Sequence, residues 1–130
     1  MQNIYEYLED YDNVVFASPI WFSSLSGHFL NLASRIQSIW AAGYFQKKTI
    51  LHKEKNGVII LVGAEGAKPE TFAIPDKTAL GIMKYFNVHR PSVERIYSLD
   101  TNNLPSAKDE AALKKCREVA EILNFKNITL

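Results

Sequence analysis

The sequence predicts an α/β domain in which a parallel sheet lies between layers of helices. Two short, almost wholly apolar runs, residues 14–17 and 57–63, are typical of strands buried on both faces. Stretches with helical periodicity alternate with these runs along the chain. Strands that alternate with helices favour right-handed crossovers and therefore a parallel sheet.

Composition limits both the size and the setting of this domain. The 130 residues form one domain, 1–130, and 15 Lys and Arg against 14 Asp and Glu predict no nucleic-acid partner. No apolar run is long enough to span a membrane. The lone Cys116 cannot close an internal disulfide, which indicates a reducing, cytoplasmic setting. No metal-binding spacing is present, and we expect solvent-facing or packing roles for His28, His52 and His89.

Three elements are predicted in the first third of the chain. Apolar residues at helical spacing predict a short helix over 3–11, with Asn3 as its N-cap. The strand at 14–17 ends at Ser18-Pro19. A longer helix follows from Ser26 to about Trp40, because apolar residues recur there on one face.

The rest of the chain continues the alternation. After the strand at 57–63, a helix is expected to begin near Pro75, because proline is tolerated in a first turn. Its apolar stripe is Ala79, Met83 and Phe86.

The last two predicted elements are an edge strand and a helix. Charges at Glu94 and Arg95 suit a strand over 92–98 at the edge of the sheet. Ser106 and Asp109 resemble a capping box that opens the last helix. The inner face of that helix is expected to carry Leu113, Cys116, Ala120 and Leu123.

The loop after the first strand, residues 18–27, is the strongest candidate for a binding site. Ligands of open α/β sheets bind beyond the carboxyl ends of the strands. Trp21 and Phe22 lie in this loop among several hydroxyl groups, so a planar ligand with polar edges could stack there. Alternatively, both rings plug the top of the core.

The order of several motifs resembles one family. The run Ser-Pro-Ile-Trp-Phe at 18–22, followed by Leu-Ser-Gly and a helix with Arg35, is similar to NAD(P)H-dependent FMN reductases and multimeric flavodoxin-type flavoproteins. Further segments along nearly the whole chain resemble successive sequence blocks of the same family, in the same order: 36–42, 58–66, 68–70, 83–87 and 100–110.

The resemblance implies a three-layer α/β/α flavodoxin-like fold that binds FMN and takes electrons from NAD(P)H. In such proteins the flavin carries the chemistry, so no catalytic side chain is expected. The positions implied to contact the flavin ring are Pro19, Ile20, Trp21, Phe22, Ser24, Gly63, Ala64, Glu65 and Gly66.

Three departures from the family pattern stand out. The family's first βαβ unit, with its phosphate-binding loop, has no counterpart before Met1, so the sheet is expected to hold about three strands, family strands 3-4-5. Ser34 stands where an aspartate commonly precedes the arginine. Glu65 lies in a loop that is often all glycine, where its charge would oppose that of a reduced flavin.

The missing unit would leave strand 14–17 without an inner neighbour. We therefore expect a homo-oligomer that covers this edge, either by strand pairing between two copies or by docking of the first helix, or a partner chain that encodes the missing half. The first functional hypothesis is an FMN-binding, NAD(P)H-dependent oxidoreductase-like protein. Its site would be completed by oligomerisation, or FMN would bind weakly. The alternatives are a truncated, non-catalytic assembly or interaction module and a fragment without independent function.

Overall fold

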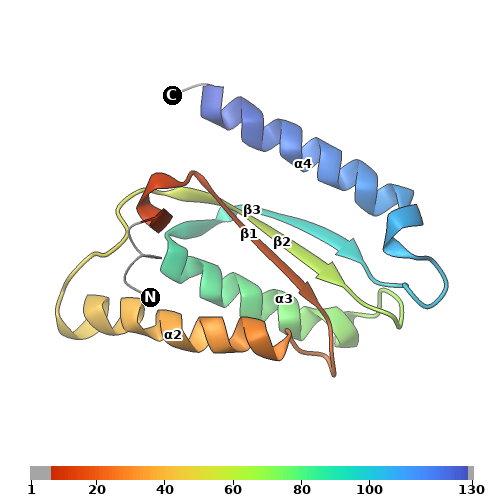
Figure 1. Ribbon diagram of the computed structural model, residues 1–130, viewed down its shortest axis with the longest axis horizontal. Helices are drawn as coiled ribbons and strands as arrows, with labels where there is room; N and C mark the ends of the chain where they lie inside the picture. Colours follow the sequence, from red (N-terminus) through yellow and green to blue (C-terminus); the bar gives the residue numbers. More distant parts are fainter. Residues whose placement is uncertain (1–6, 129–130) are drawn as a thin grey trace.

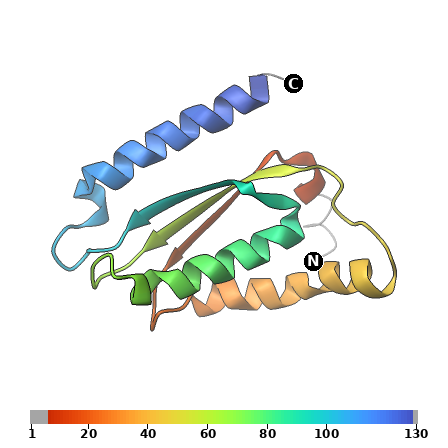
Figure 2. The ribbon, with the colours of Figure 1, turned by 180° about the vertical axis from the view of Figure 1, so that it is seen from behind.

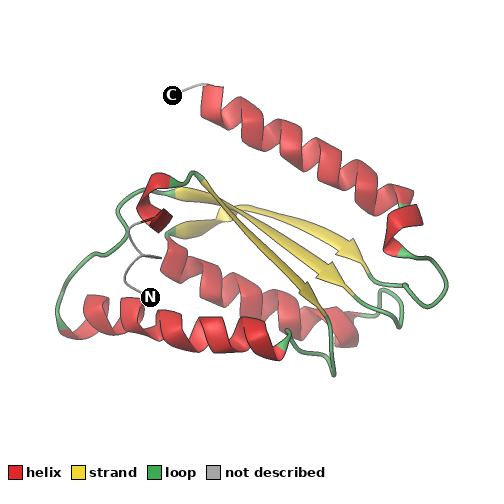
Figure 3. Ribbon diagram, in the orientation of Figure 1, coloured by secondary structure: helices red, strands yellow, loops and turns green. Residues whose placement is uncertain are grey.

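The computed structural model describes residues 7–128. It confirms a parallel sheet of three strands in the order β1-β2-β3, with helices on both faces (Figures 1 and 3). α2 and α3 cover one face, and α4 lies across the other. In chain order the elements are β1 (Asn13–Pro19), α2 (Gly27–Phe45), β2 (Lys55–Val62), α3 (Pro69–Met83), the 3₁₀ helix η1 (Lys84–Phe86), β3 (Val88–Ser98), the 3₁₀ helix η2 (Ser106–Lys108) and α4 (Glu110–Ile128).

The first predicted helix is only partly within the described residues. Residues 7–10 are helical, whereas the proposed cap, Asn3, lies outside the described range. The carboxylate of Glu9 accepts hydrogen bonds from the backbone N–H groups of His52 and Lys53 at 3.0–3.1 Å. It also lies 4.0 Å from Nζ of Lys55, whose side chain is fully buried. Burial lowers the pKa of the Lys55 ammonium group.

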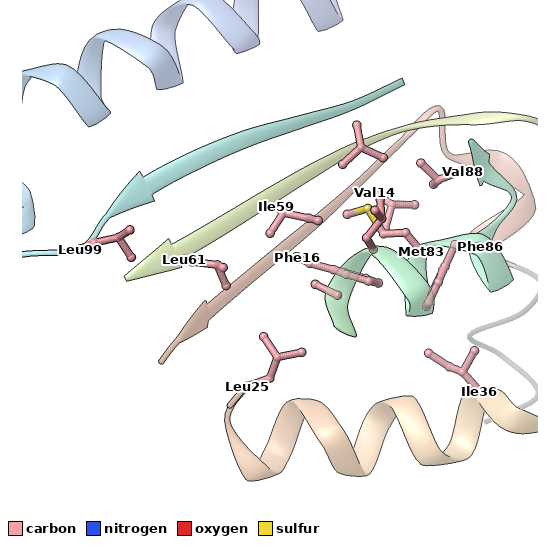
Figure 4. Packing of buried hydrophobic residues seen from close by; sticks show 13 residues of the cluster. Val14, Phe16, Leu25, Ile36, Ile59, Leu61, Met83, Phe86, Val88 and Leu99 are labelled. Atoms are coloured by element: carbon pink, nitrogen blue, oxygen red, sulfur yellow. The ribbon is translucent and has the colours of Figure 1, made fainter. Parts of the chain in front are cut away.

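The main core lies between the sheet and the helices α2 and α3 (Figure 4). Ile59 of β2 and Met83 of α3 have no exposed surface at its centre. Phe16 contacts Phe29 and Phe86 edge to face, with ring centroids 4.9 and 5.3 Å apart. The predicted stripe Ala79, Met83 and Phe86 is wholly buried, as expected.

The opposite face of the sheet is covered only in part. Val58 and Ile96 pack against Val119 of α4, which lies over β2 and β3 (Figure 2). Side chains of β1 alternate between buried and exposed, and Val15 is 54% exposed. The prediction that residues 14–17 are buried on both faces is therefore wrong. The cluster under α4 is built from residues of β2 and β3, whereas Val15 and Ala17 of β1 are exposed.

The start of α3 also differs from the prediction. Proline occupies the first turn, as argued, but the residue is Pro69 rather than Pro75. Pro75 lies inside the helix, where it cannot donate a backbone hydrogen bond to the preceding turn. Its ring is almost completely buried, so packing against the core offsets part of that cost.

The last helix is capped by Asp109, not by Ser106. Asp109 Oδ1 accepts a hydrogen bond from the N–H of Ala112 at 3.0 Å, and Oδ2 accepts one from Ser98 Oγ at 2.8 Å. These bonds lower the pKa of the Asp109 carboxyl. Ser106 instead begins η2.

The inner face of α4 is partly as predicted. Cys116 and Leu123 pack against the sheet. Val119 rather than Ala120 is the buried residue between them, because α4 is rotated slightly from the predicted orientation.

β3 is an edge strand, as its charges predict. Glu94 pairs with Lys115 of α4 at 3.2 Å, and Arg95 Nε donates to Asp76 of α3 at 2.9 Å. The register of β3 against β2 shifts near its start, where the sheet is interrupted by a bulge. No helix in the part of the chain described here is long and apolar enough to cross a membrane.

Candidate functional site

A hollow of about 290 Å³ opens at the carboxyl ends of the strands. We call it the first hollow. Parallel α/β sheets bind ligands at this edge. The loops that follow β1 and β2 form its walls, together with the residue after β3 and the start of α3. Its lining consists of Ile20, Trp21, Phe22, Ser23, Gly63, Ala64, Glu65, Gly66, Thr71 and Leu99.

The loop after β1 folds into a tight turn. Trp21 and Ser24 exchange two backbone hydrogen bonds of 2.9 and 3.0 Å, so the chain reverses over Phe22 and Ser23. Both central residues have positive φ, 50° and 54°. This conformation is unfavourable for a bulky residue such as phenylalanine and costs on the order of 1 kcal/mol or more per residue.

The strained turn also exposes aromatic surface. Trp21 is 61% exposed, and Phe22 is completely exposed. The alternative in which both rings plug the core is therefore wrong, because neither side chain is buried. Strain combined with exposed apolar surface is typical of residues held in place to contact a ligand.

The loop after β2 supplies the facing wall. Its backbone continues the pattern of the sheet, since Gly63 N–H donates to Ser98 at 2.8 Å. Gly66 has φ of +88°, a conformation that side chains rarely adopt, and its N–H donates to the carbonyl of Leu99. Ile20 N–H donates to Val62 at 2.8 Å and ties the first loop to the second.

The structure brings together most of the residues implied by the family resemblance. Seven of the nine line the first hollow; Pro19 and Ser24 do not. Pro19 is the last residue of β1, and Ser24 closes the turn through its backbone. Three lining residues were not predicted: Ser23, Thr71 and Leu99. The position of Leu99 just after β3 could have identified it, whereas nothing in the sequence marks Thr71.

Charge is sparse in this hollow. Among its described lining residues only Glu65 is charged, and none is basic. Arg35 and His28 lie on α2 and do not line it. No group of three or more His, Cys, Asp or Glu within residues 7–128 is arranged to hold a metal ion. The lining therefore suits a flat, largely uncharged group.

The three parallel strands with helices on both faces form a flavodoxin-like α/β fold. Solved structures share it. The crystal structure of azoreductase from Bacillus anthracis str. Sterne superimposes with a TM-score of 0.57 at 15% identity. That of azoreductase AzrA does so with a TM-score of 0.51 at 13% identity. These matches cover 95% and 93% of this chain.

The likeness is one of fold. The chain spans 61% and 62% of the lengths of those two azoreductase structures. No protein-family model matches the sequence, and no curated protein matches it significantly.

Proposed function

We propose that the protein is an FMN-binding, NAD(P)H-dependent oxidoreductase-like protein whose flavin ring lies in the first hollow. The observation that carries the proposal is the strained turn at Phe22 and Ser23, which presents Trp21 and Phe22 to solvent beside a glycine-containing loop. A flat heterocycle would bury this apolar surface by stacking on it. The shared fold of the azoreductases supports the same edge of the sheet as the site.

Each wall has a defined part in this proposal. The aromatic turn would stack on the ring, while Gly63 and Gly66 let the backbone approach its polar edge. The flavin, when bound, would supply the redox chemistry by taking a hydride from NAD(P)H and passing electrons to an acceptor. Glu65 would disfavour negative charge on the reduced ring, because a nearby like charge raises its energy. The free thiol of Cys116 fits a cytoplasmic setting.

The site would recognise the ring more than the phosphate. Since the described lining contains no cation, the phosphate of FMN would gain little from it. We therefore expect riboflavin, which lacks the phosphate, to bind about as tightly as FMN.

Fluorescence quenching on titration of flavin with the full chain tests this proposal. The unaltered protein should quench both FMN and riboflavin. Trp21→Ala should weaken riboflavin binding by about 2- to 10-fold, since an aromatic pair contributes about 0.5 to 1.5 kcal/mol beyond burial. Tyr44→Ala is the matched control, because Tyr44 is exposed to the same extent, 60%, but lies near the far end of α2.

The quenching experiment also distinguishes a flavin-binding protein from a non-catalytic module. No quenching of either flavin by folded protein would reject the proposal and favour a non-catalytic assembly or interaction module. Equal riboflavin affinities for Trp21→Ala and unaltered protein would show that the flavin ring does not bind in this hollow.

We further propose that a second copy of the chain covers the free side of β1. Among residues 7–128, β1 pairs with β2 alone. Its other edge therefore offers unpaired backbone groups next to the exposed side chains of Val15 and Ala17. An edge of this kind favours strand pairing.

Light scattering at micromolar protein concentration measures this association. The unaltered chain should give a dimeric mass, and Val15→Lys should shift it toward a monomer, because docking would bury the new charge. Thr78→Lys, on the exposed side of α3, is the control and should leave the mass unchanged. A monomeric mass for the unaltered chain would contradict the proposal.

A further inference from the structure

A second hollow, of about 540 Å³, lies at the opposite end of the sheet from the first. It is bounded by α3, by Lys84 at the start of η1 and by the first residues of β3. Val88 begins β3, whereas Leu99, which lines the first hollow, follows its last residue (Figure 4). The stretch from Val93 to Leu99 alone spans roughly 20 Å at about 3.3 Å per residue. The two hollows are therefore separate sites.

The bulge in β3 shapes one wall of the second hollow. Val88 pairs with Lys55 and Val93 pairs with Gly57, so residues 89–92 stand opposite the single residue Asn56. This extra length displaces the segment from the regular ladder. Its residues His89, Arg90 and Pro91 are exposed and line the hollow.

The facing wall is one side of α3 and its continuation. Lys77, Gly81 and Lys84 are spaced by four and three residues, which places them on the same face of a helix. An added Cβ at Gly81 would meet no atom within 4 Å. The missing side chain at Gly81 therefore leaves open space between the two lysines.

The charges that border this hollow have one sign. The basic side chains of Lys77, Lys84 and Arg90 all line it. Its described lining contains no carboxylate. The concentration of positive charge is local, since the whole chain carries a net charge of only +1.

The acidic residues of α3 and β3 that are closest in sequence to this lining are paired elsewhere. Asp76 Oδ1 accepts hydrogen bonds from Arg95 Nε at 2.9 Å and from the Tyr97 hydroxyl at 2.8 Å. Glu94 lies 3.2 Å from Lys115 Nζ. These two carboxylates are therefore paired with Arg95 and Lys115, which do not line the second hollow.

Protection of the sheet edge explains only part of this arrangement. A bulge, a proline and a cation on an edge strand all hinder pairing with other chains. Protection of the edge strand does not require basic residues on α3 or η1, however, so it does not account for Lys77 and Lys84, which also line the hollow. Opposed cations around an open space indicate an anionic ligand.

We propose that the second hollow binds a small molecule with a flat apolar body and a phosphate tail, such as a nucleoside diphosphate. The phosphates would be held by Lys77, Lys84 and Arg90, and the body would pack on the apolar floor, to which Leu80 and Val88 contribute. The volume lies within the range of about 300 to 1,000 Å³ that is typical of small-molecule sites.

Isothermal titration calorimetry of the full chain with ADP, inorganic pyrophosphate and adenosine tests this site. ADP should bind most tightly, and its affinity should fall as salt concentration rises. Adenosine should bind at least about 10-fold more weakly, because it lacks the charge-assisted hydrogen bonds. Pyrophosphate should also bind more weakly than ADP, because it leaves the apolar floor uncovered.

Two variants, with one control, test whether ADP binds in the second hollow. Arg90→Gln should weaken ADP by about 10-fold, whereas Lys108→Gln, which removes the same charge from exposed η2, should not. Gly81→Leu should abolish ADP binding by filling the hollow without changing its charge. Unchanged ADP affinity in both Arg90→Gln and Gly81→Leu, or no binding of ADP to the unaltered chain, would overturn the proposal.

The same variants keep the two sites distinguishable. Trp21→Ala should leave ADP affinity unchanged, and Gly81→Leu should leave riboflavin quenching unchanged. A loss of ADP binding in Trp21→Ala would contradict a separate site at this end of the sheet.

Discussion

Replacement of Ile59 by alanine should lower the free energy of unfolding by about 2 to 5 kcal/mol. Ile59 lies in the central strand with no exposed surface, so truncation leaves a cavity that the surrounding core can close only in part. The loss is a large fraction of the roughly 5 to 15 kcal/mol by which small domains are stable. Urea unfolding followed by circular dichroism measures it.

Val15→Ala is the matched control for this prediction. Val15 is an aliphatic residue of the neighbouring strand, but 54% of its surface is exposed. In the isolated chain its truncation should change the free energy of unfolding by no more than about 0.5 kcal/mol. Equal losses for the two variants would mean that the core does not lie on the α2 and α3 side of the sheet.

Gly57→Ala should cost about 1 to 3 kcal/mol, although the change adds a single methyl group. A Cβ at this position would lie 2.7 Å from both Met83 Sδ and Val88 Cγ1. Val88 is β-branched and buried, so it cannot rotate out of the way. Chemical unfolding of the variant measures the loss.

Two further variants define the cause of that loss. Gly43→Ala, in the exposed part of α2, should stabilise the protein by about 0.5 to 1 kcal/mol, because an added Cβ meets only a carbonyl at 3.9 Å. Adding Val88→Ala to Gly57→Ala should cost less than the sum of the two single changes, since it removes half of the clash. Strict additivity would rule out the steric explanation.

The order of elements was predictable because each strand carries its own signal. The run at 57–63 is apolar throughout, and the stripe Ala79, Met83 and Phe86 repeats with helical period, so neither depends on distant neighbours. Two of the wrong predictions, the start of α3 and the cap of α4, concern features that depend on tertiary contacts. Burial stabilises Pro75 inside α3, and a hydrogen bond from Ser98 helps to fix Asp109 as the cap of α4.

The candidate site was predictable where it follows a strand. Residues 20–22 follow a strand, where parallel sheets bind ligands, and the family resemblance implied both these residues and residues 63–66. Thr71 reaches the same hollow only because α3 starts at Pro69, earlier than predicted. The second hollow had no sequence signal, since the bulge that forms it arises from the register between β2 and β3.

Dimerisation through the edge of β1 that no described strand occupies would fix the relative direction of the two copies. A two-fold axis that joins the two edges by backbone hydrogen bonds must run the paired strands in opposite directions. The aromatic turns of the two copies would then project from opposite rims of one continuous sheet. A dimer of this kind would carry two independent flavin sites, each of which would have to bind its ring with residues of a single subunit.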